Sequence, residues 1–539
     1  MEKFPTLHRR AFVLTTACGL AAPALLGSGG ARAAESTIVE IENGRLRGAW
    51  ADGALSFKGI PYAADTGGRN RFMGPRPAPN WGGVRDALQF GDRSPQGAGA
   101  VGAVGEARFS ENCCVLNVFT PDLNSRARRP VLVYVHGGGF RSGSGEGIDG
   151  AKLAKFGDVV VVTVNHRLNL FGYLPIGHLH PDFADAANAG QLDLIAVLGW
   201  IKANIAQFGG DAGNVTIGGS SGGGSKVAAL MVMPSSKGLF HRAYNQSGST
   251  ANDLRPAADS EPLIDAFLRR LNVDKSNPHR LQALPPSQLL AAYAGAVDAL
   301  GTDDYRAVID GRHIPHGTLT PEGIAVNGSV PVMIGHTNSE AVSMVSGDAR
   351  SVTDDQLRAR IKAQFGVDDA QVAAVVEGYR REVPTRTPWD ILVAFASDIR
   401  FRGLMIEAGE ALARNRRAPV YMYNFAWQLP NGGGSPHGVD VPFAFYDIDP
   451  TRTGAGEGPQ KVALSLASAF VAFARTGNPN NPQIPQWRPF VPGTRPTMVI
   501  DETCRLVNDF RGGDLRATSG IPKQEQFKIL GGPLFRYRA

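Results

Sequence analysis

The stretch Gly218-Gly219-Ser220-Ser221-Gly222-Gly223-Gly224 directly follows the apolar run Val215-Thr216-Ile217. A strand that leads into a glycine-framed serine and then into a helix is typical of a nucleophile elbow. Glycine is needed two residues before and after the serine because side chains there would collide with the neighbouring strand and helix. Ser220 and Ser221 both have this framing, so the residues alone leave the choice of nucleophile open.

The same order of strand, turn and helix recurs through the first half of the chain. β-Branched runs at 131–135, 159–164 and 215–217 predict strands, and apolar residues at helical spacing predict helices over 192–205 and 226–233. Such alternation indicates an α/β protein with a large, mostly parallel central sheet flanked by helices. Reactive loops in such proteins gather at the carboxyl ends of the strands.

The middle of the chain, from about 255 to 425, has a mainly helical pattern. Helices are predicted over 262–271, 286–300 and 353–379, with a strand-like run at 330–334 and another at 420–427. We interpret the helices as insertions that cover the active-site edge of the sheet. Residues 34–539 are therefore predicted to form a single domain.

The first 33 residues have the pattern of an export signal. Arg9-Arg10 precede an apolar run from Ala11 to Leu26, and Ala31-Arg32-Ala33 offers a cleavage site. The run is shorter than a bilayer span, so we expect no stable membrane anchor. The segment around the two arginines resembles a twin-arginine signal, which predicts a periplasmic or secreted protein in a bacterium. Cys18 leaves a lipoprotein acceptor as the alternative.

Charge and cysteine content exclude other classes. The signal carries four basic and one acidic residue, so the net charge of +6 falls to +3 in the mature chain. No dense basic run remains, and we predict no nucleic-acid partner. Three mature cysteines, two of them adjacent, do not form a disulfide scaffold. The sequence does not indicate an oligomeric state.

A second glycine-rich loop follows the strand predicted at 131–135. It reads His136-Gly137-Gly138-Gly139-Phe140. Three consecutive glycines let the backbone approach a substrate closely and aim free N–H groups at one point, as an oxyanion hole requires. The alternative is a loop without catalytic duty.

Other segments, spread over nearly the whole mature chain, occur in the order of one enzyme family. They are Phe57-Lys58-Gly59-Ile60-Pro61-Tyr62-Ala63, Glu111-Asn112-Cys113-Cys114-Val115-Leu116-Asn117-Val118, Asn165-His166-Arg167-Leu168, Phe208-Gly209-Gly210-Asp211, Lys237-Gly238-Leu239-Phe240-His241-Arg242, Gln246-Ser247-Gly248-Ser249 and Thr476-Gly477-Asn478-Pro479. With the two glycine loops, they resemble the type B carboxylesterases, which include cholinesterases and bacterial p-nitrobenzyl-type esterases. The resemblance implies the α/β-hydrolase fold.

The resemblance also implies the roles of the site residues. It assigns the nucleophile to Ser221 and places Ser220 where the family usually carries glutamate. The oxyanion donors would be the N–H groups of Gly138, Gly139 and Gly222.

A serine nucleophile needs a base and a carboxylate that orients the base. Pro436-His437-Gly438-Val439-Asp440-Val441-Pro442-Phe443 resembles the family's catalytic-histidine segment, and Gly335-His336-Thr337-Asn338-Ser339-Glu340 its catalytic-glutamate segment. The order Ser221, Glu340, His437 is the order of an α/β hydrolase.

Other polar residues receive weaker interpretations. Ser247 is predicted either to support the triad through a hydrogen bond or to be a simple turn serine. Because the family's glutamate is absent at Ser220, the hydrogen bonding below the elbow must be rebuilt, and Ser220 is a second candidate for a supporting residue. His178, His180 and Asp182 have alternate spacing without a further ligand cluster, so we assign no metal and no cofactor.

Departures from the family bear on the substrate. No cysteine lies between the signal and Cys113, so a disulfide found there in many relatives is not expected. The loop 96–104 contains no aromatic residue, which argues against choline esters because an aromatic face would hold the ammonium. Arg141 and Lys226 suggest esters whose acyl part bears a carboxylate; the alternative is that both are solvated or paired locally.

Together these features predict a serine hydrolase of carboxylic esters, with a bulky or carboxylate-bearing small-molecule ester and water as its reactants and an acyl-enzyme intermediate. A carbamate or amide hydrolase would use the same residues. A noncatalytic adhesion-type relative is the remaining alternative, although such relatives lack the serine.

Overall fold

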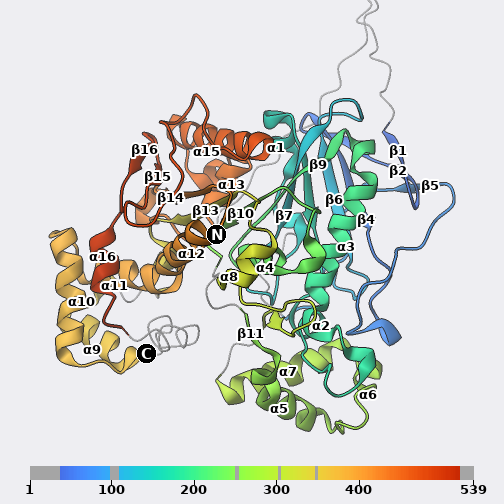
Figure 1. Cartoon of the computed structure of the whole chain (residues 1–539), viewed down its shortest axis with the longest axis horizontal. Helices are drawn as coiled ribbons and strands as arrows, with labels where there is room; N and C mark the ends of the chain where they lie inside the picture. Colours follow the sequence, from blue (N-terminus) through green and yellow to red (C-terminus); the bar gives the residue numbers. More distant parts are fainter. Residues whose placement is uncertain (1–36, 98–107, 249–253, 302–304, 346–349, 522–539) are drawn as a thin grey trace, which may run out of the picture. The chain divides into compact units, whose positions relative to one another are not determined.

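The computed structural model describes residues 37–97, 108–248, 254–301, 305–345 and 350–521 (Figure 1). Its strands are β1 Ile38–Ile41, β2 Gly44–Arg47, β3 Ala49–Ala51, β4 Ala54–Pro61, β5 Val84–Asp86, β6 Val115–Thr120, β7 Arg129–Val135, β8 Val160–Val164, β9 Gly210–Ser220, β10 Arg242–Gln246, β11 Arg255–Pro256, β12 Val308–Ile309, β13 Val332–Thr337, β14 Val420–Phe425, β15 Thr497–Ile500 and β16 Arg505–Val507. Its α-helices are α1 Gly150–Gly157, α2 Asn169–Gly172, α3 Ala189–Asn204, α4 Gly222–Val232, α5 Glu261–Leu271, α6 Arg280–Ala283, α7 Pro286–Leu300, α8 Pro321–Val326, α9 Asp354–Phe365, α10 Asp369–Glu382, α11 Pro388–Ser397, α12 Gly403–Asn415, α13 Asp440–Ala444, α14 Pro450–Thr453, α15 Glu457–Thr476 and α16 Gly512–Ala517.

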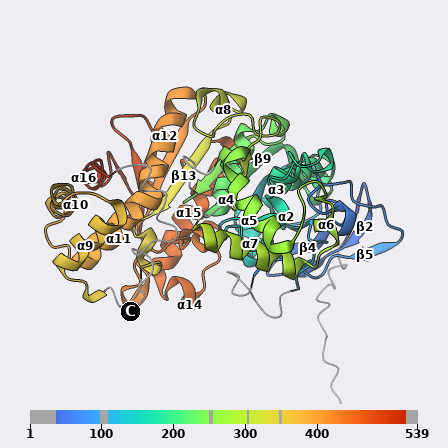
Figure 2. The same cartoon turned by 90° about the horizontal axis from the view of Figure 1, so that it is seen from below.

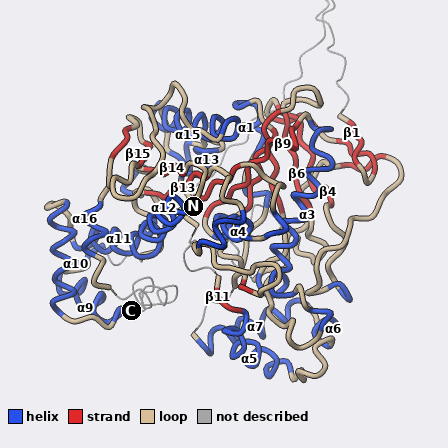
Figure 3. Tube along the Cα trace, in the orientation of Figure 1, coloured by secondary structure: helices blue, strands red, loops and turns tan. Residues whose placement is uncertain are grey.

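An 11-stranded mixed sheet forms the centre of the fold (Figure 3). Its order is β16-β15-β14-β13-β10-β9-β7-β8-β6-β4-β3. The neighbours from β15 to β8 pair in parallel, while β16, β6, β4 and β3 join antiparallel. The predicted large, mostly parallel sheet of an α/β-hydrolase fold is confirmed. Because β9, β10 and β13 are adjacent, the loops after their carboxyl ends lie side by side.

Alternate residues of each buried strand pack into two different hydrophobic cores, because strand side chains alternate between the two faces of the sheet. On β7, Val131, Val133 and Val135 pack with α3, α4 and α12. Leu132 and Tyr134 instead pack with α1, α13 and α15. Helices therefore cover both faces of the sheet, and Figure 2 shows α4 beside β9 and α3 on one of them.

The predicted helical middle is present, with one difference in detail. The helix predicted over 353–379 is two helices, α9 and α10, because Gly366 ends α9 in the left-handed region at φ 61° and Asp368 caps the next helix. These helices pack with α11 and with Ala341 just after β13. The helices α5 and α7 pack with α2, which follows β8. Both groups of inserted helices thus contact segments that follow carboxyl ends of the sheet.

The chain from Thr37 onward clusters as one compact unit. The predicted signal segment, residues 1–33, lies outside the described residues. Within the described part of the chain, no helix combines the length and apolarity needed to cross a membrane.

Candidate active site

Ser221 occupies the sharp turn between β9 and α4. Its backbone has φ 57° and ψ −128°, a conformation that L-residues rarely adopt and that costs about 1–3 kcal/mol. Its N–H donates to the carbonyl of Gln246, at the end of β10, over 2.7 Å. Ser220, by contrast, is the buried last residue of β9. The strained position is that of Ser221, which favours it over Ser220 as the exposed nucleophile of the elbow.

Two elbow glycines are required by close packing against β7. A Cβ added at Gly219 would lie 2.4 Å from the carbonyl oxygen of Val135, and one added at Gly223 would lie 2.0 Å from the same oxygen. Such distances are not tolerated when the obstacle is backbone. The glycine framing in the sequence therefore reflects the contact between the elbow and the neighbouring strand.

The loop after β7 approaches the start of α4. Gly138 and Gly139 have φ of 91° and 59°, and a Cβ added at Gly222 would lie 2.8 Å from the nitrogen of Gly139. Within the described ranges, the N–H groups of Gly138, Gly139 and Gly222 donate no hydrogen bond. The N-terminus of an 11-residue helix adds positive potential at the same place. The geometry suits stabilisation of an oxyanion.

Glu340 and His437 form a buried acid–base pair. Glu340 Oε2 lies 2.6 Å from His437 Nδ1, and the backbone N–H of His437 donates to the Glu340 carbonyl over 3.1 Å. The carboxylate is fully buried, while the ring of His437 is partly exposed. This contact fixes the ring and leaves Nε2 as the proton-accepting nitrogen.

The histidine segment reaches the elbow. A Cβ added at Gly438 would lie 3.9 Å from Ser220 Oγ. Between the described side chains of Ser221 and His437 no hydrogen bond is formed. Catalytic hydrogen bonds of this kind are often long until a substrate is bound.

Ser247 supports the acid. It follows β10, the strand between β9 and β13, and its hydroxyl donates to Glu340 Oε1 over 2.6 Å. The N–H of Thr337 donates to the same oxygen over 2.7 Å. Of the two interpretations of Ser247, the structure therefore favours the hydrogen-bonding one.

These contacts decide the charge of the acid. Burial opposes ionisation of Glu340, but the charge of His437 and hydrogen bonds from His437, Ser247 and Thr337 outweigh it and hold the pKa of the carboxyl below its usual value. Glu340 is thus ionised whenever the protein is near neutral pH.

A second buried network underlies the histidine segment and was missed at the sequence level. Asp440 Oδ2 accepts hydrogen bonds from Gln246 Nε2 at 3.0 Å and from the Tyr423 hydroxyl at 2.6 Å. It connects β10, β14 and α13 below the elbow, where Ser220 contributes only a small side chain. Asp440 lies three residues after His437, which was the available signal.

Phe401 was also missed. It belongs to a π-helical turn, Asp398–Arg402, between α11 and α12, and its ring centroid lies 4.5 Å from that of His437. The ring covers the imidazole of His437 from the side of the inserted helices. Nothing near Phe401 in the sequence signals this contact.

The two cations suggested as substrate contacts have different surroundings. Arg141 is exposed, with its guanidinium 4.7 Å from the ring centroid of Tyr305. Lys226 is fully buried in α4, with its ammonium 4.5 Å from the ring centroid of Phe140. Its place behind the oxyanion loop argues against direct contact with a substrate.

The structure brings a third potential metal ligand to the pair His180 and Asp182. His180 and Asp182 are joined by His279, which lies 97 residues from Asp182 in sequence and hydrogen-bonds its carboxylate over 3.0 Å. The N–H of Asp182 donates to His180 Nδ1 over 3.2 Å. These groups satisfy one another, and we assign them no metal.

Cys113 and Cys114 are buried with free thiols, and Cys504 is partly exposed and also free. Most of the loop 96–104, on which the argument against choline esters rests, lies outside the described residues.

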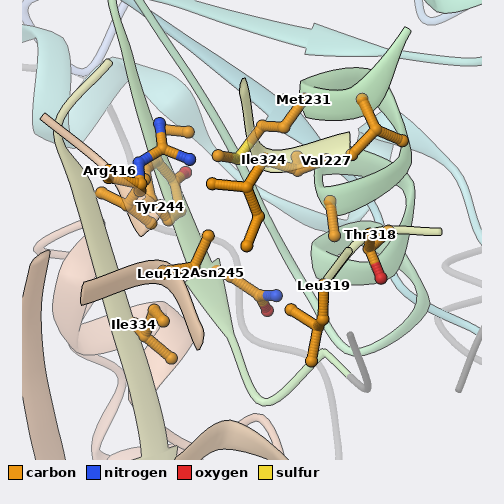
Figure 4. A pocket seen from close by; sticks show the side chains of 14 residues that line it. Val227, Met231, Tyr244, Asn245, Thr318, Leu319, Ile324, Ile334, Leu412 and Arg416 are labelled. Atoms are coloured by element: carbon orange, nitrogen blue, oxygen red, sulfur yellow. The ribbon is translucent and has the colours of Figure 1, made fainter. Parts of the chain in front are cut away.

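An apolar cavity lies on one side of α4 (Figure 4). Side chains of Met231, Ile324 and Leu319 converge on it, and Arg416 lies at its edge. Neither the proposed triad nor the glycine loop contributes to its lining. Its volume of about 30 Å³ is too small for an ester substrate.

Comparison with known proteins agrees with this geometry. The model of the carboxylesterase family matches residues 35–516. The para-nitrobenzyl esterase of Bacillus subtilis (strain 168) is 31% identical over 500 residues, covering 88% of this chain and 96% of the relative. The phenmedipham hydrolase of Pseudarthrobacter oxydans is also 31% identical over 500 residues, covering 88% and 98%.

A solved structure leads to the same family. The carboxylesterase of Geobacillus stearothermophilus superposes with a TM-score of 0.78 at 32% identity, covering 89% of this chain and 99% of that one. The chain belongs to the carboxylesterase family.

Proposed function

We propose that this carboxylic ester hydrolase works through Ser221, His437 and Glu340. His437, oriented by Glu340, accepts the proton of Ser221 as the serine oxygen attacks the ester carbonyl. The imidazolium then protonates the leaving alcohol, and an acyl-enzyme remains. Water, deprotonated by His437, attacks the acyl carbonyl, and the carboxylic acid leaves as Ser221 regains its proton.

The observation that carries this proposal is the juxtaposition of three loops. A serine at φ 57° follows β9, a buried serine follows β10, and Glu340 follows β13, in contact with both Ser247 and His437. These are adjacent parallel strands, so their carboxyl ends present the groups at one edge of the sheet.

The N–H groups of Gly138, Gly139 and Gly222 would hold the negative oxygen of the tetrahedral intermediate. Loss of one such donor typically lowers turnover by about a hundred- to a thousandfold. The glycine loop therefore makes a large contribution to the rate of its own, beside that of the nucleophile.

For substrate choice we propose esters whose acyl part carries a carboxylate, recognised by Arg141. What supports this is an exposed guanidinium directly after the oxyanion loop. Arg141→Glu should lower hydrolysis of anionic esters more than that of neutral esters of equal size; equal losses on both would refute it.

For localisation we propose export by the twin-arginine route, supported by Arg9-Arg10 and the apolar run after them. Replacing both arginines by lysine should leave the enzyme in the cytoplasmic fraction. Unchanged export would contradict the route.

The catalytic roles are tested by two adjacent serines. Ser221→Ala should abolish hydrolysis of a p-nitrophenyl ester in the purified protein, whereas Ser220→Ala should keep most of it. A panel of esters, carbamates and anilides then separates ester hydrolysis from the related activities. An active Ser221→Ala and an inactive Ser220→Ala would show that Ser220, and not Ser221, is the nucleophile.

A further inference from the structure

Lys226 carries a buried amine that the proposed mechanism does not use. The residue lies on α4, five positions after Ser221, and is 0% exposed. In the described part of the chain its Nζ has no hydrogen-bond partner. Its contact is with a ring: Nζ lies 4.5 Å from the centroid of Phe140.

Phe140 is part of the oxyanion loop. It follows Gly139 directly, has φ 62°, and its carbonyl accepts a hydrogen bond from Asn169 over 2.7 Å. Tyr173 contacts the same ring edge-to-face at 5.0 Å. A Cβ added at Gly222 would lie 3.1 Å from the Phe140 nitrogen. The orientation of the Phe140 ring is thus coupled to the backbone that faces the elbow.

A buried amine without a partner is costly, because its charge loses hydration and gains no hydrogen bond. Methionine has a similar length and would fill the same space without that cost. Burial lowers the pKa of Lys226 to about 7, so its charge changes near neutral pH.

Two titratable groups near Lys226 follow neighbouring strands of the sheet. His136 follows β7 and His166 follows β8, and their rings stack at 4.8 Å. Burial, followed by the charge of Lys226, lowers the pKa of His136 to about 3 and that of His166 well below its usual value. Both histidines are therefore neutral wherever Lys226 titrates.

The arginines of this region are compensated. Arg93 pairs with Glu146 at 2.6 Å, and Arg167 pairs with Asp193 at 2.6 Å. The positive charge of Lys226 is consequently the one in this cluster that changes near neutral pH.

We propose that Lys226 is a positioning residue for the oxyanion hole: its ammonium, held against Phe140, fixes the loop that carries Gly138 and Gly139 and adds positive potential behind the developing oxyanion. The inference rests on the proposed function of that loop. The free energy of a cation–π interaction on a desolvated aromatic face is large enough to change kcat measurably.

The test compares Lys226→Met with Lys58→Met. Lys58 is the matched control, because its Nζ lies 4.6 Å from the ring centroid of Phe90 but the residue belongs to β4, away from the elbow. At about pH 6, Lys226→Met should lower kcat about tenfold with little change in KM, while Lys58→Met should leave both unchanged.

The pH profile separates positioning by charge from mere packing. The ratio of wild-type to Lys226→Met kcat should be largest at about pH 6 and shrink toward about pH 9, because the wild-type amine loses its proton in this interval. Lys226→Gln provides a second neutral variant should the methionine variant not fold.

Equal kcat for wild type and Lys226→Met at about pH 6 would overturn the inference, and so would a loss that is the same at every pH. Failure of the proposed function looks different: the wild type would not hydrolyse esters, or Ser221→Ala would remain active.

Discussion

Glu340 and Lys226 are both fully buried beside the same elbow, yet their charges have opposite surroundings. Glu340 has hydrogen bonds from Ser247, Thr337 and His437, and its pKa is lowered. Among the residues that the structure describes, Lys226 forms no hydrogen bond and contacts an aromatic ring, and its pKa is lowered to about 7. For an acid a lowered pKa means a charge kept, whereas for a base it means a charge easily lost.

The difference shows how one site can hold a permanent and a conditional charge. The anion is permanent because three donors replace the water it lost. The cation is conditional because, in the described part of the chain, the ring of Phe140 replaces that water and no hydrogen-bond acceptor does.

Among changes to the two buried charges and their surroundings, the largest effect is expected from Glu340→Gln. An amide keeps the shape but cannot stabilise the imidazolium of His437, so kcat should fall roughly a thousand- to ten-thousandfold. Glu322→Gln, an exposed residue on α8, is the matched control and should retain activity. Near-normal turnover of Glu340→Gln would remove Glu340 from the triad.

Glu340→Gln should also change how the free energy of unfolding depends on pH. Because the folded-state pKa of Glu340 is lowered, its contribution is present above the unfolded-state pKa and is lost as pH falls through the folded-state pKa. Glu340→Gln should therefore flatten the acid limb of the free energy of unfolding, measured by urea titration over a pH series. An unchanged acid limb would contradict this sign.

The next largest effect is expected from adding a side chain in the tightly packed elbow. Gly223→Ala puts a Cβ 2.0 Å from the Val135 carbonyl oxygen, so we expect a loss of about 1–3 kcal/mol or more in unfolding free energy together with a loss of activity. Gly199→Ala on the exposed side of α3 has free space around its Cβ and should be neutral or stabilising. Equal stability of the two variants would contradict the packing of the elbow against β7.

Removing one partner of the permanent charge should have a moderate effect. Ser247→Ala deletes the 2.6 Å hydrogen bond to Glu340, and kcat should fall about tenfold. Ser236→Ala, which also deletes a buried hydroxyl but one bonded to the Leu230 carbonyl, should keep normal kcat. A wild-type rate in Ser247→Ala would make Ser247 a turn residue only.

Lys226→Met, which should lower kcat about tenfold at about pH 6, should at the same time raise stability. Lys226→Met should unfold at a higher denaturant concentration than wild type at neutral pH, because the buried amine is gone. Since folding lowers the pKa of this base to about 7, the penalty is complete below that pH and fades above it. The stability gap should therefore shrink as pH rises from about 7 toward the unfolded-state pKa of lysine, about 10.4.

Local sequence patterns predicted much of the fold and most residues of the candidate site. The strand before Ser221 and the glycines around it follow from local geometry, and the register of the elbow agrees with the positive φ of Ser221. Glu340 and His437 were singled out by order and resemblance, and the structure brings them into contact.

What could not be predicted depends on packing between distant segments. The contact of Phe401 with His437, the network of Asp440 with Tyr423 and Gln246, and the approach of His279 to Asp182 join residues whose local sequences carry no signal. The burial of Lys226 is of the same kind, because its helix pattern does not reveal that Phe140 covers the amine. The boundary at Gly366 was missed because apolar residues continue on both sides of it.

The most direct test of the central claim is to locate a covalent adduct. After reaction with an organophosphonate, the tryptic peptide 203–226 contains both Ser220 and Ser221, so fragment masses must assign the modified residue. We expect a phosphonylated Ser221, formed in wild type and Ser220→Ala and absent in Ser221→Ala. An adduct on Ser220, or none in an active enzyme, would contradict it.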